Sequence, residues 1–550
     1  MSNSIYRVPP AVNEQVSSFA PGTPERVSLK SKLKELSTKT IDIPIIINGK
    51  EIRTGVTSNC VMPHNHQHIL GSYHNAGDNE IQMAIKSSLD ARKFWSEMSW
   101  ESRVAIFKKM ASLLKGPHRD IINAATMLGQ SKNAFQAEID SACELIDFFN
   151  FNCEYLQQIY EEQPAYSPDG MWNQVEYRGL EGFIFAVTPF NFTSIAANLP
   201  TAPALMGNTV IWKPASSSVY SGYFLMKLFE AAGLPKGVIN FLPGSGAKVG
   251  NPVLESKYLA GIHFTGSTEV FQGMWRKVGE NIHKYRTYPR IVGETGGKDF
   301  ILAHKSSDVQ ALATAMVRGA YEYQGQKCSA ASRCYIPSSI WDEVKYEFLK
   351  QVSSIKMGDV NDFSNFVNAV IDEKAFDSIS NYIEYAKNDS NAKIICGGGY
   401  DKSVGYFIEP TAILTTNPNF KLMEEEIFGP VLTIYVYDLD ESDNDKSWED
   451  ICKVVDSTSE YALTGAIFST CRKSINSAKK FLVHSAGNFY INDKPTGAVV
   501  GQQPFGGSRA SGTNDKAGSA ANLMRWVSQR TIKETFVPPT DYRYPFLEEK

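Results

Sequence analysis

Short buried strands alternate with helical patterns between residues 182 and 268. Apolar runs predict four strands, at 182–187, 209–212, 238–242 and 259–264. Strands that alternate with helices form a parallel sheet covered by helices on both faces, and such sheets bind ligands at the carboxyl ends of their strands. The sequence therefore predicts a doubly wound α/β sheet with a ligand site along that edge.

A second α/β unit is predicted after Lys298. It has strands at 299–303 and 333–336, and between them a helix whose apolar residues recur from 309 to 320. Gly325 is expected to end this helix. Cys328 would then lie in an irregular segment of small and polar residues.

Length and composition restrict the class of protein. At 550 residues the chain is long enough for two or three domains, and its 43% hydrophobic and 21% charged residues are ordinary for a soluble globular protein. A net charge of −4 without a long basic run argues against nucleic-acid binding, and no apolar stretch reaches membrane-spanning length. The eight cysteines form no C-x-x-C pair, which disfavours a disulfide framework or a zinc site and suits a reducing compartment.

The first 40 residues are predicted to form an extended arm followed by a short charged helix, because prolines and serines precede a charged stretch. The arm lacks the apolar core of a signal peptide, and its acidic residues and few arginines make a poor mitochondrial presequence. His64, His66 and His68 alternate as they would on one face of a strand, where a metal could bind. Because no cysteine or acidic residue adjoins them, we expect a polar loop and no metal site.

Three further helical stretches are predicted before residue 160. Two lie between Asp78 and Leu114, with Ser102 and Arg103 between them, and a long one runs from Phe135 to Tyr155. The acidic residues of the long helix are expected on a solvated face. These residues are Glu138, Asp140, Glu144 and Asp147.

Cys328 is a candidate nucleophile, since a thiol in a partly polar loop can form a thiolate that attacks an electrophile. The alternative is that this lone cysteine is a small buried hydrophobe. Glu294 is a candidate general base, because glycines around it allow the backbone to approach a ligand closely. The alternative is an ordinary solvated loop residue.

Two motifs together resemble the aldehyde dehydrogenase superfamily. The segment E-T-G-G-K at 294–298 matches its glutamate motif, and G-Q-K-C-S-A at 325–330 matches its cysteine motif. The resemblance implies an α/β fold of the aldehyde dehydrogenase type, with two doubly wound parallel-sheet domains and a small β flap for oligomerisation. It also implies Cys328 as nucleophile through a thiohemiacetal and a thioester, Glu294 as the base that activates water, and no metal.

Two helix starts are candidates for binding a dinucleotide. The glycine pattern G-x-G-x-x-x-G at 244–250 is one residue longer than the usual fingerprint, and Gly266-Ser267-Thr268 follows the next predicted strand. Free backbone amides at a helix start favour anions. The superfamily has the same glycine pattern, and its G-S-T turn lies against the cofactor pyrophosphate.

The resemblance supplies the remaining cofactor-binding residues. Lys213 in W-K-P-A matches a lysine that binds the adenosine ribose, and E-I-F-G-P implies that Glu426 holds the nicotinamide ribose and that Phe428 packs by the ring. For Phe428 a core position is the alternative. Ser216 stands where many NAD-preferring relatives have Glu, which weakens the argument for NAD over NADP. NAD is nevertheless expected, bound by Thr188, Lys213, Ser216, Gly246, Gly266, Ser267, Thr268, Glu426 and Phe428.

Motifs near the end of the chain resemble one subgroup, the delta-1-pyrroline-5-carboxylate dehydrogenases. These motifs are I-N-D-K, V-G-Q-Q-P-F-G-G and A-S-G-T-N-D at 491–515; Q-A-E-I-D, Y-R-G-L-E-G and T-P-F-N-F-T occur earlier, and the resemblance covers nearly the whole chain from about residue 20. Members oxidise L-glutamate γ-semialdehyde to L-glutamate in proline catabolism. We therefore expect this NAD-dependent activity here.

The subgroup resemblance also assigns substrate contacts. The α-carboxylate would be bound by Ser329 and the amides of Gly497 and Ala498, since backbone amides supply several aligned donors. Phe192 and Phe505 would flank the aliphatic chain, and Glu144 would pair with the ammonium. Asn191 would stabilise the thiohemiacetal oxygen together with the Cys328 N–H; from its position after Pro-Phe alone, a turn residue is the alternative.

The resemblance also implies the division of the chain. We expect an NAD-binding domain at 1–160 and 180–297, with the arm at 1–40, a catalytic domain at 298–490, a substrate-anchor loop at 491–527, and oligomerisation strands at 161–179 and 528–550. A homodimer or an assembly of dimers follows, because an exposed strand pair is unstable alone. The mitochondrial matrix is implied, with the cytoplasm as the alternative. The rival functions are dehydrogenation of another aldehyde, acyl transfer to coenzyme A, and a non-enzymatic binding role.

Overall fold

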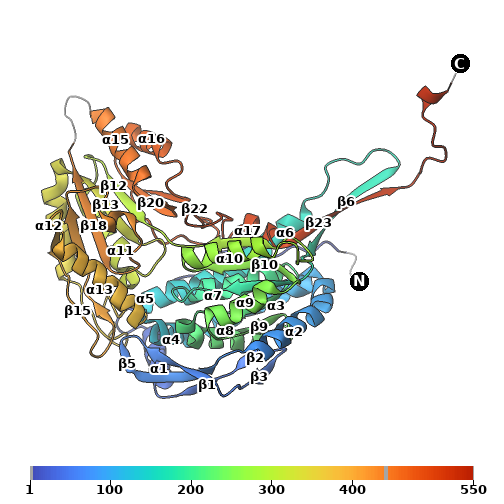
Figure 1. Cartoon of the computed structure of the whole chain (residues 1–550), viewed down its shortest axis with the longest axis horizontal. Coiled ribbons are helices and arrows are strands. Elements are labelled where there is room, and N and C mark those ends of the chain that lie inside the picture. The colour runs from blue at the N-terminus through green and yellow to red at the C-terminus, as the bar shows by residue number, and fades with distance from the viewer. Residues whose placement is uncertain (1–3, 439–443, 549–550) are drawn as a thin grey trace.

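The computed structural model describes residues 4–438 and 444–548, and two seven-stranded sheets dominate it (Figure 1). The first sheet has the order β11-β10-β7-β8-β9-β2-β3. Its five parallel strands are β7 (Phe183–Val187), β8 (Thr209–Lys213), β9 (Ile239–Phe241), β10 (Leu259–Thr265) and β11 (Arg290–Glu294). β2 (Ile45–Ile47) and β3 (Lys50–Ile52) extend it in antiparallel fashion. The four predicted strands are confirmed, and β11 is an addition that was not predicted.

The chain builds this sheet outward from β7 in one direction and then returns to the other side of β7 with β10. Such a reversal leaves a crevice at the carboxyl ends of the two strands, where ligands bind. The helices that follow the strands are α7 (Thr193–Leu205), α8 (Val219–Ala232), α9 (Gly246–Glu255) and α10 (Thr268–Glu280).

The second sheet has the order β14-β17-β18-β13-β12-β20-β21. Its parallel strands are β12 (Asp299–Ala303), β13 (Ala331–Pro337), β17 (Thr411–Thr415), β18 (Val431–Tyr437), β20 (Thr464–Phe468) and β21 (Asn488–Ile491), and β14 (Ala392–Cys396) is an antiparallel edge. Its helices are α11 (Val309–Tyr321), α12 (Ser338–Ser353), α13 (Glu373–Asn388), α15 (Asn444–Ser457) and α16 (Arg472–Phe481). The predicted fold class, two doubly wound parallel sheets with a β flap, is confirmed.

Both faces of each sheet are buried, which explains the continuous apolar runs in the sequence. In β12, Phe300 and Leu302 pack into one core cluster, while Ile301 and Ala303 pack into the cluster on the opposite face. The alternation follows from the period of two along a strand.

A helical layer precedes the first sheet. It consists of α2 (Asp78–Glu97), α3 (Trp100–Lys115), α4 (Arg119–Gln130), α5 (Ala134–Ala137), a π-helical segment (Glu138–Glu144) and α6 (Leu145–Glu161). The break predicted at Ser102 and Arg103 is wrong, because Met98 and Ser99 interrupt the helices instead. Arg103 is buried, where its Nε and Nη1 donate to the carbonyls of Leu205 and Met98.

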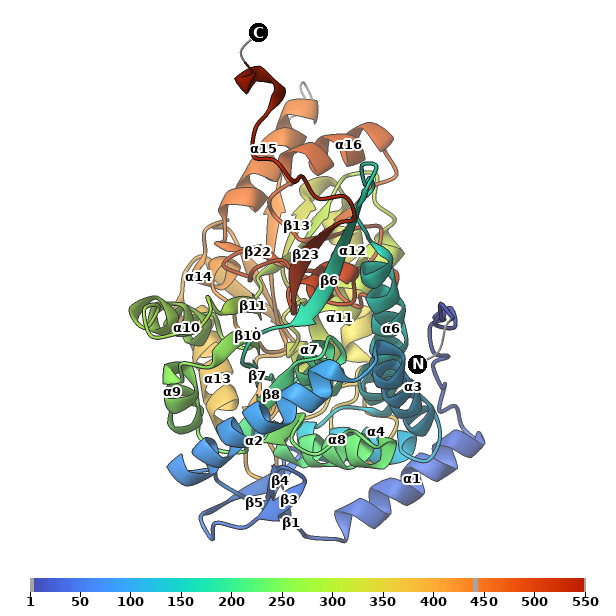
Figure 2. The ribbon, with the colours of Figure 1, turned by 90° about the vertical axis from the view of Figure 1, so that its right-hand side faces the viewer.

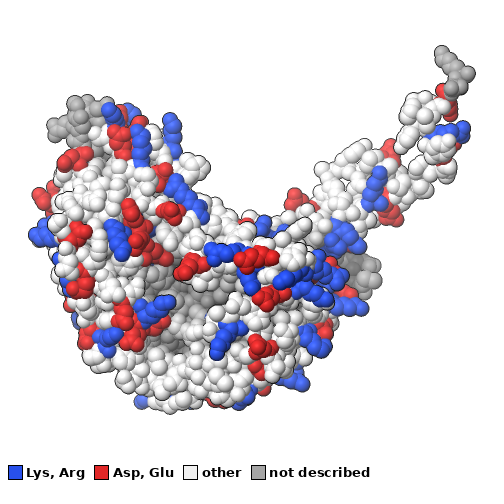
Figure 3. All heavy atoms as spheres, in the orientation of Figure 1, with Lys and Arg blue, Asp and Glu red and all other residues white. Residues whose placement is uncertain are grey.

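A two-stranded antiparallel flap projects from the body of the molecule (Figure 1). It pairs β6 (Met171–Gly179) with β23 (Val527–Thr535). The Trp172 side chain is 54% exposed on it. Over the face seen in Figure 3, acidic and basic side chains are interspersed.

The histidine-rich segment was predicted as a loop, and this is wrong. His66 and His68 lie on β5 (Asn65–His74), which pairs with β4 (Thr57–Met62) and β1 (Ile41–Ile43). Their Nε2 atoms lie 2.8 Å and 2.9 Å from the carbonyls of Lys402 and Ser37. Both imidazoles are thus used in contacts with backbone carbonyls. Among the described residues, no group of three or more His, Cys, Asp or Glu side chains could hold a metal ion.

The predicted arm and short helix are confirmed, the helix being α1 (Pro24–Ser37). The remaining short elements are α14 (Lys421–Glu424), α17 (Ala520–Met524), β15 (Tyr400–Asp401), β16 (Phe407–Ile408), β19 (Tyr461–Ala462), β22 (Ser508–Arg509) and 3₁₀ turns at Ser216–Ser218, Glu322–Gly325 and Pro545–Leu547. Within residues 4–438 and 444–548, no helix is both long and apolar enough to cross a membrane.

Candidate active site

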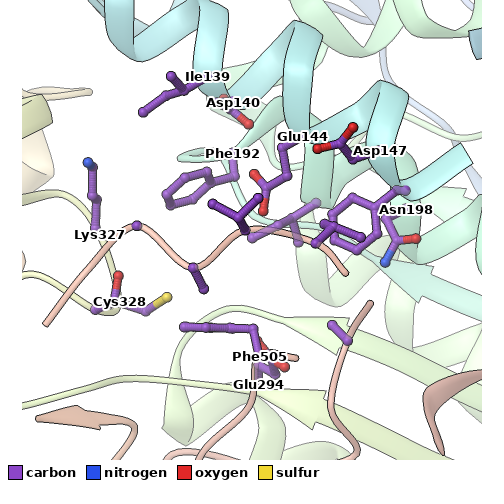
Figure 4. Close-up of a pocket in the computed structure, with 18 of the residues that line it drawn as sticks. Ile139, Asp140, Glu144, Asp147, Phe192, Asn198, Glu294, Lys327, Cys328 and Phe505 are labelled. Carbon is purple, nitrogen blue, oxygen red and sulfur yellow. The ribbon is translucent and has the colours of Figure 1, made fainter. Parts of the chain in front are cut away.

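A cavity of about 270 Å³ lies where the carboxyl ends of β10 and β11 face the segment before β13. Cys328 and Glu294 both line it, although Glu294 ends a strand of the first sheet and Cys328 precedes a strand of the second. In Figure 4 the Cys328 thiol and the Glu144 carboxylate point into the space that the labelled residues surround. The two candidate catalytic residues therefore share one site.

The helix before Cys328 ends at Tyr321, earlier than the predicted stop at Gly325. Residues 323–325 then turn the chain with positive φ angles of 52°, 55° and 65°. At Gly325 a Cβ would lie 2.2 Å from the carbonyl oxygen of Gly429, so only glycine fits there. This turn places Cys328 in an irregular segment, as predicted, with 7% of its surface exposed.

The environment of the thiol differs from the partly polar loop that the sequence suggested. Burial raises the pKa of Cys328 well above its usual value, and the carboxylates of Glu294, Asp299 and Glu426 raise it further. Its surroundings therefore favour the neutral thiol over the thiolate. Because the thiolate is the nucleophile, a proton acceptor is needed before attack.

Glu294 is the last residue of β11 and not a solvated loop residue. Before it, Gly293 leaves no room for a side chain, since a Cβ there would lie 2.3 Å from the ring of Phe271. Burial raises the pKa of Glu294 to about 8, although Lys516 opposes the rise. A carboxyl group that titrates near this pH can both accept and release a proton under physiological conditions.

Asn191 lies beside the cysteine segment. Its Nδ2 donates to the carbonyl oxygen of Gln326 at 3.1 Å, and the side chain is buried. An amide nitrogen carries two N–H groups, so one remains for a ligand.

All six predicted substrate residues line the same cavity as Cys328: Glu144, Phe192, Ser329, Gly497, Ala498 and Phe505. Ser329 Oγ lies 2.8 Å from Thr496 Oγ1, which connects the segment after the cysteine to the predicted substrate-anchor loop at 491–527. Gly497 has a φ of +100°, a conformation that side chains other than glycine rarely adopt.

The acidic residues predicted on a solvated face of the long helix are instead buried or partly buried, so that prediction is wrong. Asp140 accepts hydrogen bonds from the backbone N–H groups of Thr193 and Ser194, both at 3.0 Å. The Ser194 hydroxyl also donates to Glu144 Oε2 at 2.7 Å. The π-helical segment thereby caps the N-terminus of α7 and aims Glu144 at the cavity, and π-helical turns are frequent at functional sites.

Burial raises the pKa of Glu144 to about 8, and the nearby Asp140 charge adds to the rise. A buried carboxyl of this kind is a suitable partner for a ligand cation, since pairing offsets the cost of burying the charge.

A fully buried lysine supports the aromatic wall of the cavity. Lys132 Nζ lies 2.7 Å from Asp140 Oδ2 and 4.3 Å from the centre of the Phe192 ring. It also lies 4.4 Å from the centre of the Tyr323 ring. The ion pair and the cation–π contacts together fix the orientation of Phe192.

The predicted cofactor residues of the first sheet gather along the carboxyl ends of its strands. Thr188 follows β7, Lys213 ends β8, and Gly246 and Thr268 begin α9 and α10 after β9 and β10. Ser267 Oγ accepts from the Val270 N–H as the N-cap of α10. The neighbouring residues Ser216 and Gly266 lie along the same edge.

These residues fit a dinucleotide. The first turn of α9 is exposed, and helix starts of this kind offer free N–H groups to phosphate oxygens. Lys213 Nζ donates to the carbonyl oxygen of Pro214 at 2.9 Å, and burial lowers the pKa of Lys213 to about 8. A buried cation of this kind gains from ligand hydroxyl groups as further partners.

Glu426 and Phe428 lie in the segment between α14 and β18, on the side of the second sheet. Glu426 Oε1 accepts from the Gly297 N–H at 2.8 Å, and burial raises the pKa of Glu426 to about 7. Phe428 has a φ of +57° and packs edge-on against Phe190, with ring centres 5.8 Å apart. A strained backbone of this kind is typical of functional sites and is unusual for an ordinary core residue.

Comparison with known proteins decides the family. Residues 53–532 match the aldehyde dehydrogenase family. The chain belongs to the aldehyde dehydrogenase family. It is 52% identical over 542 residues to the mitochondrial delta-1-pyrroline-5-carboxylate dehydrogenase of Dictyostelium discoideum, covering 98% of this chain and 96% of that one. It is 44% identical over 537 residues to the mitochondrial enzyme of the same name from Homo sapiens, covering 98% and 94%.

Solved structures agree with this placement in the family. The delta-pyrroline-5-carboxylate dehydrogenase of Mycobacterium tuberculosis bound with NAD superposes with a TM-score of 0.95, at 49% identity and with both chains fully covered. The 1-pyrroline-5-carboxylate dehydrogenase from Thermus with bound NAD gives a TM-score of 0.89 at 30% identity, over 96% of this chain and 100% of that one.

In this aldehyde dehydrogenase, several residues of the cavity were not anticipated. Asn13, Glu14 and Val16 come from the N-terminal arm, and Glu322 and Lys494 form a charged corner with Lys327 and Arg318. Lys327 lies within the cysteine motif and Glu322 lies three residues before it, so this charge pair was a usable signal. The arm carried none, because nothing in its sequence indicates which surface it contacts.

Proposed function

We propose that this protein oxidises L-glutamate γ-semialdehyde, which is in equilibrium with delta-1-pyrroline-5-carboxylate, to L-glutamate with NAD in proline catabolism. One observation carries the proposal: a single cavity brings together Cys328, Glu294, Glu144 and the loop at Gly497 and Ala498. It thus offers a nucleophile, a base, a partner for an ammonium and donors for a carboxylate. The names of the relatives from Dictyostelium and human agree with this chemistry.

The chain's own groups can perform each proton and bond change. Glu294, whose pKa is raised to about 8, can accept the thiol proton, and the Cys328 sulfur then bonds to the aldehyde carbon. The electron pair of the C=O bond moves to oxygen, where the Asn191 amide and the Cys328 N–H can donate to it. NAD, when bound, supplies the chemistry of accepting a hydride. Glu294 then gives the thiol proton to solvent and takes a proton from the water that attacks the thioester carbon. The C–S bond breaks, and the thiolate is released.

Substrate selection follows from the two ends of the cavity. The amides of Gly497 and Ala498 and the Ser329 hydroxyl would bind the α-carboxylate, while Glu144 would pair with the ammonium. Phe192 and Phe505 would enclose the methylene groups between them. Hydrogen bonds to charged groups are worth about 1.5–3 kcal/mol each, so two of them could discriminate about a hundredfold or more against an aldehyde without the carboxylate.

For the cofactor, the helix starts at Gly246 and at Gly266-Ser267-Thr268 would receive the phosphates. Lys213 and Ser216 would contact the adenosine ribose, with Thr188 beside them, and Glu426 and Phe428 would contact the nicotinamide end. The Mycobacterium relative is described as bound with NAD, and we assign NAD here on that likeness.

The assembly and location are also proposed by likeness. Two copies would pair through the β6–β23 flap, because an isolated strand pair is marginal in water. We also propose that the chain divides into a cofactor part at 1–160 and 180–297, a catalytic part at 298–490, an anchor loop at 491–527 and flap strands at 161–179 and 528–550. Relatives named mitochondrial support the mitochondrion as its compartment.

Two variants test the catalytic assignment. Cys328→Ala should abolish NADH formation. Glu294→Gln should slow thioester hydrolysis more than hydride transfer and so give a burst of NADH followed by slow turnover, because the thiol proton can also pass to water whereas hydrolysis needs the base. Near-normal turnover of Cys328→Ala would overturn the assignment. Product analysis with coenzyme A present separates the rival acyl-transfer function, since only that rival forms an acyl-coenzyme A.

A further inference from the structure

The N-terminal arm, residues 8–19, lies along α6 and the π-helical segment before it, and Figure 2 shows it beside these helices. Every third arm residue donates its backbone N–H to a side chain there, at 2.5–2.9 Å. The pairs are Val8 with Gln157, Ala11 with Glu154, Glu14 with Asp147, and Ser17 with Glu138. A repeat of three residues is that of a polyproline-type backbone. The arm is therefore docked by a regular set of contacts.

Asn13 connects the arm to the substrate-anchor loop at 491–527. Its Nδ2 donates to Asp147 Oδ2 at 2.8 Å and to the carbonyl oxygen of Val500 at 2.7 Å. Its Oδ1 accepts from Gln502 Nε2 at 2.8 Å. Both N–H groups of the Asn13 amide are thus used. Only a side-chain amide can donate two hydrogen bonds and accept a third in this arrangement.

Asp147 depends on the arm for its partners. Asn13 donates to one of its oxygens and the Glu14 N–H donates to the other, at 2.7 Å. Burial raises the pKa of Asp147 to about 6, and the two arm donors oppose that rise. Without the arm, a buried carboxyl that lines the cavity would lose these hydrogen bonds, which is unfavourable.

The arm also forms part of the cavity surface. Asn13, Glu14 and Val16 line the same cavity as Cys328. The Glu14 carboxylate forms ion pairs with Arg119, at 2.8 Å, and with Lys115. The arm therefore presents no unpaired charge from Glu14 to a ligand. Its contribution to the cavity is its shape and its hydrogen bonds.

We propose that the arm is a wall of the substrate site and that Asn13 is a positioning residue, which holds the 497–502 loop at the separation from Cys328 that a substrate carboxylate requires. This inference rests on the proposed function, because it assigns the loop to the carboxylate. An aldehyde without a carboxylate does not use the loop and should not depend on Asn13.

The test compares kinetics for L-glutamate γ-semialdehyde and for pentanal in the full-length enzyme. Asn13→Ala should raise KM for the semialdehyde about tenfold, the value of one lost hydrogen-bonded anchor, while kcat changes less than about twofold and pentanal is unaffected. Asn13→Asp keeps the size but loses the donors, and should behave as Asn13→Ala does. Val12→Ala is the matched control, since Val12 is in the same arm and 76% exposed, and it should match the wild type.

Hydrogen exchange supplies the second readout. The N–H groups of Gln502 and Gln503 both donate to the carbonyl oxygen of Val499, and their exchange should become faster in Asn13→Ala but not in Val12→Ala. A wild-type KM together with unchanged exchange in Asn13→Ala would overturn the proposal, as would faster exchange throughout the chain with equal losses for both aldehydes. If the wild type itself shows no preference for the semialdehyde, the proposed function fails, and the loop exchange still decides whether Asn13 holds the loop.

Discussion

Ser329 and Thr496 lie 167 positions apart in the chain, yet their hydroxyl oxygens are 2.8 Å apart in the cavity wall. Ser329, which follows the proposed nucleophile, is therefore held in place by Thr496, which directly precedes the proposed carboxylate-binding residues Gly497 and Ala498. Each hydroxyl can donate and accept, so the pair can present one O–H to a ligand while it keeps its mutual contact.

Ser329→Ala should lower kcat/KM for L-glutamate γ-semialdehyde about tenfold, because one hydrogen bond to a carboxylate is lost, and should leave pentanal within about twofold. Thr496→Ser retains the hydroxyl and should remain near wild type. An equal loss for both aldehydes in Ser329→Ala would show that the serine acts on the chemistry rather than on the carboxylate.

Glu144→Gln should raise KM for L-glutamate γ-semialdehyde by about tenfold or more, because the ammonium loses its charged partner. Glutarate semialdehyde has the same length and carboxylate but no ammonium, so its KM should change little. The glutamine retains an acceptor for the Ser194 hydroxyl, which limits structural disturbance. A similar rise in KM for both substrates would contradict the assignment of Glu144.

The pH dependence of turnover should report Glu294. Burial raises its pKa to about 8, and a general base works in its deprotonated form, so thioester hydrolysis should speed up as the pH rises through about 8 and slow down below it. Steady-state NADH formation after the burst measures this step when hydrolysis is limiting. In Glu294→Gln the remaining slow rate should lose this dependence, and an unchanged profile would assign the titration to another group.

The buried pair of Lys132 and Asp140 should matter for stability as well as for the shape of the cavity. Lys132→Met leaves a buried carboxylate without its cation, a change that costs about 3–5 kcal/mol in comparable cases. Thermal unfolding should therefore shift clearly to lower temperature. Lys86→Met removes a partner from the exposed pair with Asp90, and its effect should stay within about 0.5 kcal/mol. Equal melting temperatures for the two variants would contradict this account.

The strands were predictable because both faces of each sheet are buried. A strand in such a sheet is a continuous apolar run, as from Phe300 to Ala303. β11 escaped prediction because Arg290, Gly293 and Glu294 interrupt its apolar pattern. The cysteine and glutamate motifs are local signals, and the resemblance that they carry led to residues that do line one cavity.

The burial of the acidic helix residues was not predictable from periodicity. A helical pattern shows which residues share a face but not what covers that face. Asp140 is covered by Lys132, eight residues before it, and by the start of α7. Asp147 is covered by the arm. The start of α7 and the arm are distant in sequence, and no local pattern marks Lys132 as a buried partner. The environment of Cys328 was mispredicted for the same reason, since the carboxylates around it come from three other segments.

Substrate selection can be measured by NADH formation with three aldehydes of equal length: L-glutamate γ-semialdehyde, glutarate semialdehyde and pentanal. We expect kcat/KM to fall in that order, with about a hundredfold or more between the first and the last, because the ammonium and then the carboxylate contacts are lost. Equal values for all three would contradict the claim that Glu144 and the 497–498 loop select an amino acid semialdehyde.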